Sequence, residues 1–98
     1  MKIKVAGLNY NVVQKTNAEM QDRIGLANFN GQEISINKEH TIQTKMIAFY
    51  HEIIHIISDA YGLSLTEQQV KIGTHALLAF LAENTNIGLT LKEIINEP

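Results

Sequence analysis

The fold is decided by a stretch in the middle of the chain, residues 41–62, which read TIQTKMIAFYHEIIHIISDAYG. Thr41 is a good N-cap, because its hydroxyl can accept a hydrogen bond from a free backbone N–H of the first turn, and Gly62 is a typical helix stop. Between them apolar residues recur at steps of three and four, which is the spacing of one face of an α-helix. Since the stretch is apolar almost all round, we expect a long buried helix. The recurring residues are Met46, Phe49, Ile53, Ile56, Ile57 and Ala60.

Two histidines and a glutamate interrupt this helix in the pattern H-E-x-x-H, formed by His51, Glu52 and His55. Their four-residue spacing puts both imidazoles on one helix face, where both can bind a single Zn²⁺ at about 2.0–2.1 Å. Glu52 then lies beside the metal and can act as general base on water activated there. The competing interpretation is structural, with two histidines satisfied inside a packed core. Metal binding is the stronger interpretation, because polar groups without partners would destabilise so apolar a helix.

A catalytic zinc needs a third protein ligand, and a second predicted helix offers two candidates. This helix begins after the N-cap Thr66 and continues to about Asn84. If the two helices are antiparallel, a rise of about 1.5 Å per residue brings residues 72–75 level with the metal, which favours His75. Glu67 would serve only if the helices cross steeply. A glutamate in a first helical turn also has an ordinary role, since it complements the helix dipole.

The chain before the helices is expected to form a small sheet. Alternation of apolar residues changes parity at Ala6-Gly7, which predicts a turn or bulge there. Asn30-Gly31 predicts a type I′ hairpin between a strand near residues 24–29 and one near residues 32–37. Asn17 is a candidate N-cap for a single helical turn or a loop between the strands.

Composition limits the function classes. The chain has 98 residues, 45% of them hydrophobic, with 8 Lys plus Arg, 10 Asp plus Glu and no Cys. This length predicts one domain over residues 1–98. The mixed tail from Asn86 to Pro98 suggests a short final helix around residues 91–95. A net charge of −2 leaves no basic field for phosphates, so we expect no nucleic-acid partner. The lack of a signal-peptide pattern and of a long apolar run favours a cytoplasmic location and no membrane partner. Without cysteine, a metal would be held by imidazole and carboxylate groups.

Beyond the central pentapeptide, most of residues 1–84 resembles a family of small zincin-type metallopeptidases from phages and bacterial mobile elements, related to the ImmA/IrrE-type metallopeptidases. The similar segments are MKIKVAGLNYNV at residues 1–12, GLANFNGQEISINKEH at residues 25–40 and HEIIHIISDAYGLSLTEQQV at residues 51–70.

The resemblance implies an α+β, zincin-like fold with a small antiparallel sheet packed on two long helices. It implies that an edge strand of the sheet, here Gln32 to Asn37, can pair with an extended peptide beside the metal. It also implies that His51 and His55 are Zn²⁺ ligands and that Glu52 is the general base. The chain departs from the family pattern at Lys71, where a glutamate often stands, so that either His75, one turn further along the same stripe, takes the role of third ligand or the metal site is incomplete.

Two functions follow as expectations. The first is a zinc-dependent metallopeptidase that hydrolyses a protein or peptide substrate, such as one specific regulatory protein. The alternative is a catalytically silent zincin-fold module that binds a metal, or a protein partner through its edge strand. Neither the substrate nor the oligomeric state can be inferred from the sequence.

Overall fold

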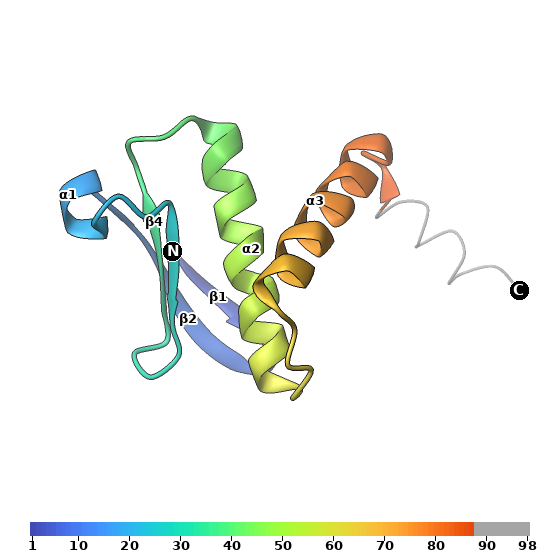
Figure 1. The fold of residues 1–98 in the computed structure, drawn as a ribbon, viewed down its shortest axis with the longest axis horizontal. Helices are drawn as coiled ribbons and strands as arrows, with labels where there is room; N and C mark the ends of the chain where they lie inside the picture. The colour runs from blue at the N-terminus through green and yellow to red at the C-terminus, as the bar shows by residue number, and fades with distance from the viewer. Residues whose placement is uncertain (88–98) are drawn as a thin grey trace, which may run out of the picture.

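A four-stranded sheet and two long helices make up the α+β fold in the computed structural model, which describes residues 1–87 (Figure 1). Helix α2 crosses one face of the sheet, and α3 lies on the side of α2 that faces away from the sheet. The short helix expected around residues 91–95 lies outside the described residues. The elements are β1 (Lys2–Val5), β2 (Leu8–Lys15), α1 (Asn17–Met20), β3 (Gly25–Asn28), β4 (Glu33–Asn37), α2 (Ile42–Ala60) and α3 (Glu67–Glu83).

The first two strands form a tight hairpin, as the change of parity predicted. Ala6 and Gly7 both have positive φ, at 50° and 81°, and connect Val5 to its antiparallel partner Leu8. Two successive positive φ values are typical of a two-residue turn whose twist matches that of the strands. The turn brings Val5 and Tyr10, from opposite parities, into one core.

The strand order is β1-β2-β4-β3, and two expectations about the sheet are wrong. The sheet is mixed rather than antiparallel, because β2 and β4 run parallel while the outer pairs are antiparallel. The expected edge strand, β4, lies inside the sheet, and β3 is the edge. A parallel pair needs a crossover connection, and here α1 and β3 provide it. Strand β4 suits the interior, since its residues 34–37 are all buried.

The loop between β3 and β4 differs from the predicted type I′ turn. It covers the four residues 29–32, and neither Asn30 nor Gly31 has positive φ. Instead, the Asn28 side chain accepts a hydrogen bond from the Gly31 backbone N–H at 2.9 Å, and Gln32 takes φ 49°. The asparagine side chain thus organises the loop by mimicking a backbone turn. Upstream, the helical turn α1 has Thr16 as its N-cap rather than Asn17, in a capping box with Glu19.

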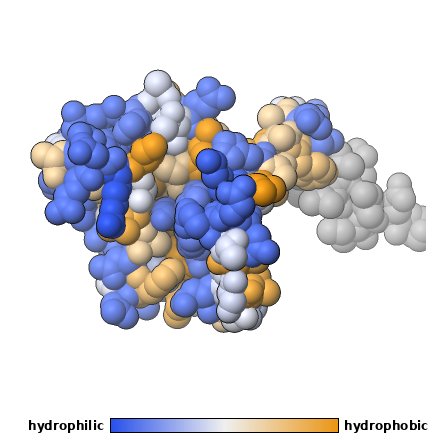
Figure 2. Space-filling model, viewed as in Figure 1, coloured by the Kyte–Doolittle hydropathy of each residue, from blue (hydrophilic) through white to orange (hydrophobic). Residues whose placement is uncertain are grey.

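Helix α2 has its predicted N-cap, Thr41, but is less buried than its sequence suggested. Its buried residues are Glu52, Ile56 and Ser58, whereas Met46 is 50% exposed. The short strands cover only one side of the helix. Apolar patches therefore remain among the polar surface (Figure 2). The core lies between α2 and the sheet and contains Val5, Tyr10, Ile34, Ile36 and Ile56.

Helix α3 has its predicted N-cap, Thr66, in a capping box with Gln69. Only Val70 and Thr74 of this helix are buried. The axes of α2 and α3 are close near the start of α3 and diverge along it, so that the pair forms a V (Figure 1). Within residues 1–87, no helix has the length and hydropathy required for a membrane span.

Candidate metal centre

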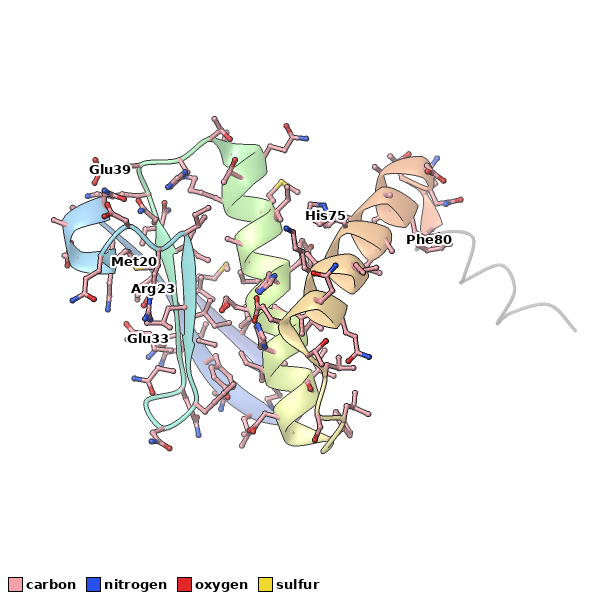
Figure 3. The ribbon with its side chains drawn as sticks, viewed as in Figure 1. Met20, Arg23, Glu33, Glu39, His75 and Phe80 are labelled. Atoms are coloured by element: carbon pink, nitrogen blue, oxygen red, sulfur yellow. The ribbon has the colours of Figure 1, made fainter. Side chains whose placement is uncertain are left out.

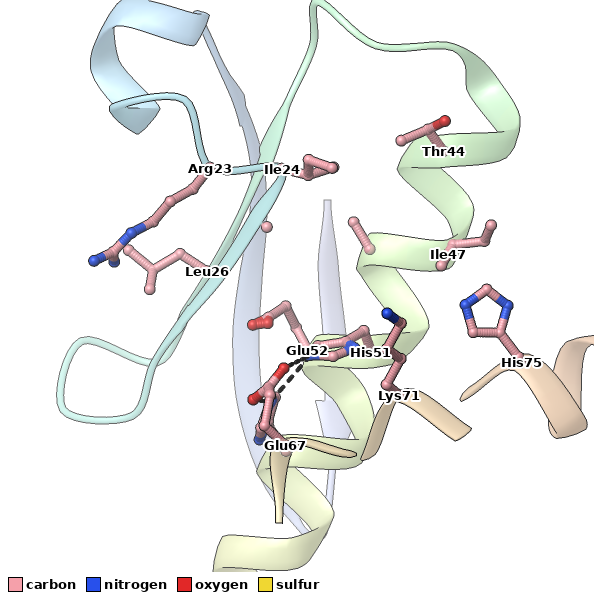
Figure 4. A pocket seen from close by; sticks show the side chains of 13 residues that line it. Arg23, Ile24, Leu26, Thr44, Ile47, His51, Glu52, Glu67, Lys71 and His75 are labelled. Carbon is pink, nitrogen blue, oxygen red and sulfur yellow. Dashed lines mark hydrogen bonds and ion pairs between the residues drawn. The ribbon is translucent and has the colours of Figure 1, made fainter. Parts of the chain in front are cut away.

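Three side chains from two helices converge on one point. His51 and His55 lie one turn apart on α2, and Glu67 lies in the first turn of α3 (Figure 4). His51 Nε2 is 2.6 Å from Glu67 Oε1, His55 Nε2 is 2.9 Å from Glu67 Oε2, and the two Nε2 atoms are 3.1 Å apart. Among the described residues, this trio forms a group of side chains that could hold a metal ion.

The donor set suits a zinc ion. Ligand bonds of about 2.0–2.1 Å in tetrahedral geometry place ligand atoms about 3.3 Å apart. The separations of 2.6 and 2.9 Å involve different oxygens of Glu67, and one ligand atom from each of the three residues lies within 4.8 Å of the others. This range includes the tetrahedral spacing. Two imidazoles and one carboxylate leave a fourth coordination position for water or substrate, as catalytic zinc sites do.

The structure brings Glu67, and not the favoured candidate His75, to the two histidines. His75 lies eight residues further along α3, about 12 Å along the helix axis at 1.5 Å per residue. It projects into the space between the helices, away from the trio (Figures 3 and 4). The geometry therefore favours Glu67, the alternative candidate, over His75 as the third residue of a group that could hold a metal.

The path of the connector between α2 and α3 explains why Glu67, and not His75, lies beside the two histidines. The expectation assumed that α3 starts level with the end of α2. Instead the connector turns back beside α2, where Ser58 holds it at two points. The Ser58 carbonyl accepts from the Leu63 N–H and its hydroxyl accepts from the Leu65 N–H, both at 2.9 Å. Helix α3 thus begins level with His51 and His55.

Glu52 is the buried acid of the site. Its side chain points to the opposite side from the trio's exposed edge, toward β3, and the residue is only 7% exposed. Burial raises the pKa of the Glu52 carboxyl, while His55 and His51 counteract the rise. A hydrogen bond from the backbone of Ala27 in β3 also lowers this pKa. The carboxyl is therefore held next to the ligands by the edge strand.

Gly25 is a residue of this site that the sequence analysis passed over. A Cβ at Gly25 would lie 3.2 Å from Glu52 Cγ and 3.3 Å from Ala48 Cβ, so β3 approaches α2 closely here. A glycine within a strand is a signal of such an approach, and it could have indicated that another segment packs closely against this strand.

A cavity of about 500 Å³ opens beside the trio. One side is β3 with the residues just before it, the floor is α2, and the other side is the first half of α3. The lining is mainly apolar, with charged groups concentrated at the metal end and along α3. The lining residues that matter below are Ile24, Leu26, Ile47, Glu52, Lys71 and His75.

Comparisons with protein-family models, with curated protein sequences and with solved structures find no match for this chain. Its function is therefore inferred from the geometry of the site.

Proposed function

We propose that the protein is a zinc-dependent metallopeptidase of the zincin type, in which His51, His55 and Glu67 hold the metal and Glu52 is the general base. One observation carries the proposal. The ligand atoms of three residues, two of them in an H-E-x-x-H helix, converge beside a buried carboxylate at the side of a cavity. Each of these residue types has a defined task in hydrolysis by a metal.

Zinc held by the trio would supply Lewis acidity, which lowers the pKa of water and polarises the scissile carbonyl. The chain itself supplies the proton transfers. Glu52 accepts a proton from the attacking water and then passes it to the leaving amine. Its burial between α2 and β3 fixes the carboxylate in one position and keeps bulk water from competing for it.

The edge strand β3 is the proposed place for the substrate backbone. It is the last strand of the sheet on this side, and its residues Gly25 and Leu26 line the cavity. An extended peptide can add to such an edge through main-chain hydrogen bonds. Strand β3 thus takes the role of peptide-binding edge that the resemblance implied for residues 32–37, which lie inside the sheet.

The test compares the wild type with Glu52→Gln, both loaded with zinc, on a mixture of peptides analysed by mass spectrometry. The substitution keeps the shape of the side chain and leaves the three ligands in place. We expect cleavage by the wild type, loss of cleavage with a chelator, and a rate at least about 100-fold lower for Glu52→Gln with zinc still bound. A wild type that binds one zinc and cleaves no peptide would contradict the proposal. That result would favour the alternative, a silent module that binds metal.

A further inference from the structure

Two basic side chains follow the third ligand along α3. Glu67, Lys71 and His75 lie at four-residue steps, so they share one stripe of the helix. All three line the same cavity. The cavity therefore extends from the candidate metal centre along α3 and, on its floor, back along α2 to Thr44, about two turns before His51 (Figure 4).

Lys71 has no charged partner in the part of the chain that the structure describes. The i, i+4 pairing with Glu67 that a helix would allow is not made, because Glu67 is bound to the two histidines. No other ion pair or hydrogen bond involves the Lys71 ammonium within residues 1–87. In Figure 4 this side chain rises from α3 over the cavity, next to His51.

The charges in the cavity do not cancel once a metal is present. Its acidic side chains are Glu52 and Glu67, and the two positive charges of Zn²⁺ would balance them. Lys71 then adds a positive charge to a cavity whose other sides carry apolar side chains such as Ile24 and Ile47. Apolar walls with one sign of charge attract oppositely charged ligands strongly. Arg23 adds nothing here, since its side chain points away from the helices (Figure 4).

We infer that Lys71 forms a subsite for a carboxylate of the substrate, one residue or two from the scissile bond, and that the enzyme prefers acidic peptides. This inference rests on the proposed function. His75 lies one turn beyond Lys71 and offers a further hydrogen-bond donor at the end of the subsite. The carboxylate can come from an Asp or Glu side chain or from the C-terminus of a peptide.

The first experiment measures kcat/KM on three pools of quenched fluorogenic peptides. One pool has blocked ends and a single Glu near its centre, the second has Gln at the same position, and the third has no acid but a free C-terminus. We expect the zinc-loaded wild type to prefer the Glu pool over the Gln pool by about fivefold, the effect of one partly exposed ion pair. A preference for the third pool instead identifies the C-terminus as the source of the carboxylate.

Two variants make the comparison specific. Lys71→Gln should remove the preference. Lys4→Gln carries the same change of charge at an exposed position of β1, at the opposite edge of the sheet from β3, and should keep the preference. A preference that survives in Lys71→Gln, or no preference in the wild type, overturns the inference and leaves the proposed peptidase intact.

A binding measurement separates this inference from the proposed function. Zinc-loaded Glu52→Gln is titrated by NMR with acetyl-Ala-Glu-Ala-amide and with its Gln analogue. We expect about fivefold tighter binding of the Glu peptide, lost when Lys71→Gln is added. Direct binding of the peptide carboxylate to zinc would persist without Lys71 and would overturn the inference. If no pool is cleaved, the peptidase proposal fails, and this titration still decides whether Lys71 binds a carboxylate.

Discussion

Replacement of the third ligand tests the metal centre most directly. Both carboxylate oxygens of Glu67 contact the histidines, at 2.6 and 2.9 Å, so Glu67→Gln removes the charge of the trio without changing its shape. Structural zinc sites with four ligands bind with about 10–16 kcal/mol, or about 3 kcal/mol per ligand. That energy corresponds to about a 100-fold loss of zinc affinity in Glu67→Gln. His75→Ala should change the affinity by less than about threefold, because this side chain lies about 12 Å further along α3.

The assay is a competitive titration with a chromogenic zinc chelator, on wild type and both variants at one pH. Circular dichroism of the metal-free proteins checks that each variant is folded. The reasoning is refuted if His75→Ala loses affinity by about 100-fold while Glu67→Gln binds as the wild type does. In that case α3 would have to be shifted by about two turns along its axis, so that His75 takes the place of Glu67 beside the histidines.

Three further predictions concern stability, each measured by urea unfolding of the metal-free protein. Ser58→Ala leaves the Leu65 N–H without its acceptor and should cost about 1–3 kcal/mol, and unchanged stability would show that the connector is not held by this bond. Gly25→Ala places a methyl group against Glu52 and should cost about 1–3 kcal/mol, whereas Gly73→Ala, whose Cβ would meet nothing within 4 Å, should stabilise by about 0.5–1 kcal/mol. Equal effects of the two glycine substitutions would contradict the close approach of β3. Burial raises the pKa of the Glu52 carboxyl in the folded protein. This group therefore stabilises the fold at pH values below its ordinary pKa, and the contribution is lost as the pH rises through its raised pKa. Glu52→Gln should therefore be at least as stable as the wild type at neutral pH, and its free energy of unfolding should depend less on pH. A marked loss of stability would show that the carboxylate is needed for folding.

The sequence correctly predicts those features that depend only on residues close together in the chain. Thr41 and Thr66 are N-caps as predicted, because capping depends on a side chain and the three residues after it. The turn at Ala6-Gly7 follows from the change of parity in the strands beside it. The α+β class and the pairing of His51 with His55 follow from the same short-range spacing.

The remaining features depend on contacts between distant segments. The choice of Glu67 over His75 depends on the connector folding back onto Ser58, which no periodicity in α3 can reveal. The identity of the edge strand depends on where the hairpin of β3 and β4 joins the sheet. A single parallel pairing, between β2 and β4, moves the edge from residues 33–37 to residues 25–28. The exposure of Met46 depends on how much of α2 the sheet can cover.

The attachment of α3 to the rest of the protein gives the metal a second role. Only Val70 and Thr74 of this helix are buried, and its first turn carries Glu67, the third residue of the candidate metal group. A zinc ion bound by the trio would link α2 to α3, so part of its binding energy would stabilise the packing of α3 against α2. Without a metal, the ion pairs of Glu67 with His51 and His55 already join the first turn of α3 to α2. Metal binding and the position of α3 would therefore be coupled, because Glu67 takes part in both.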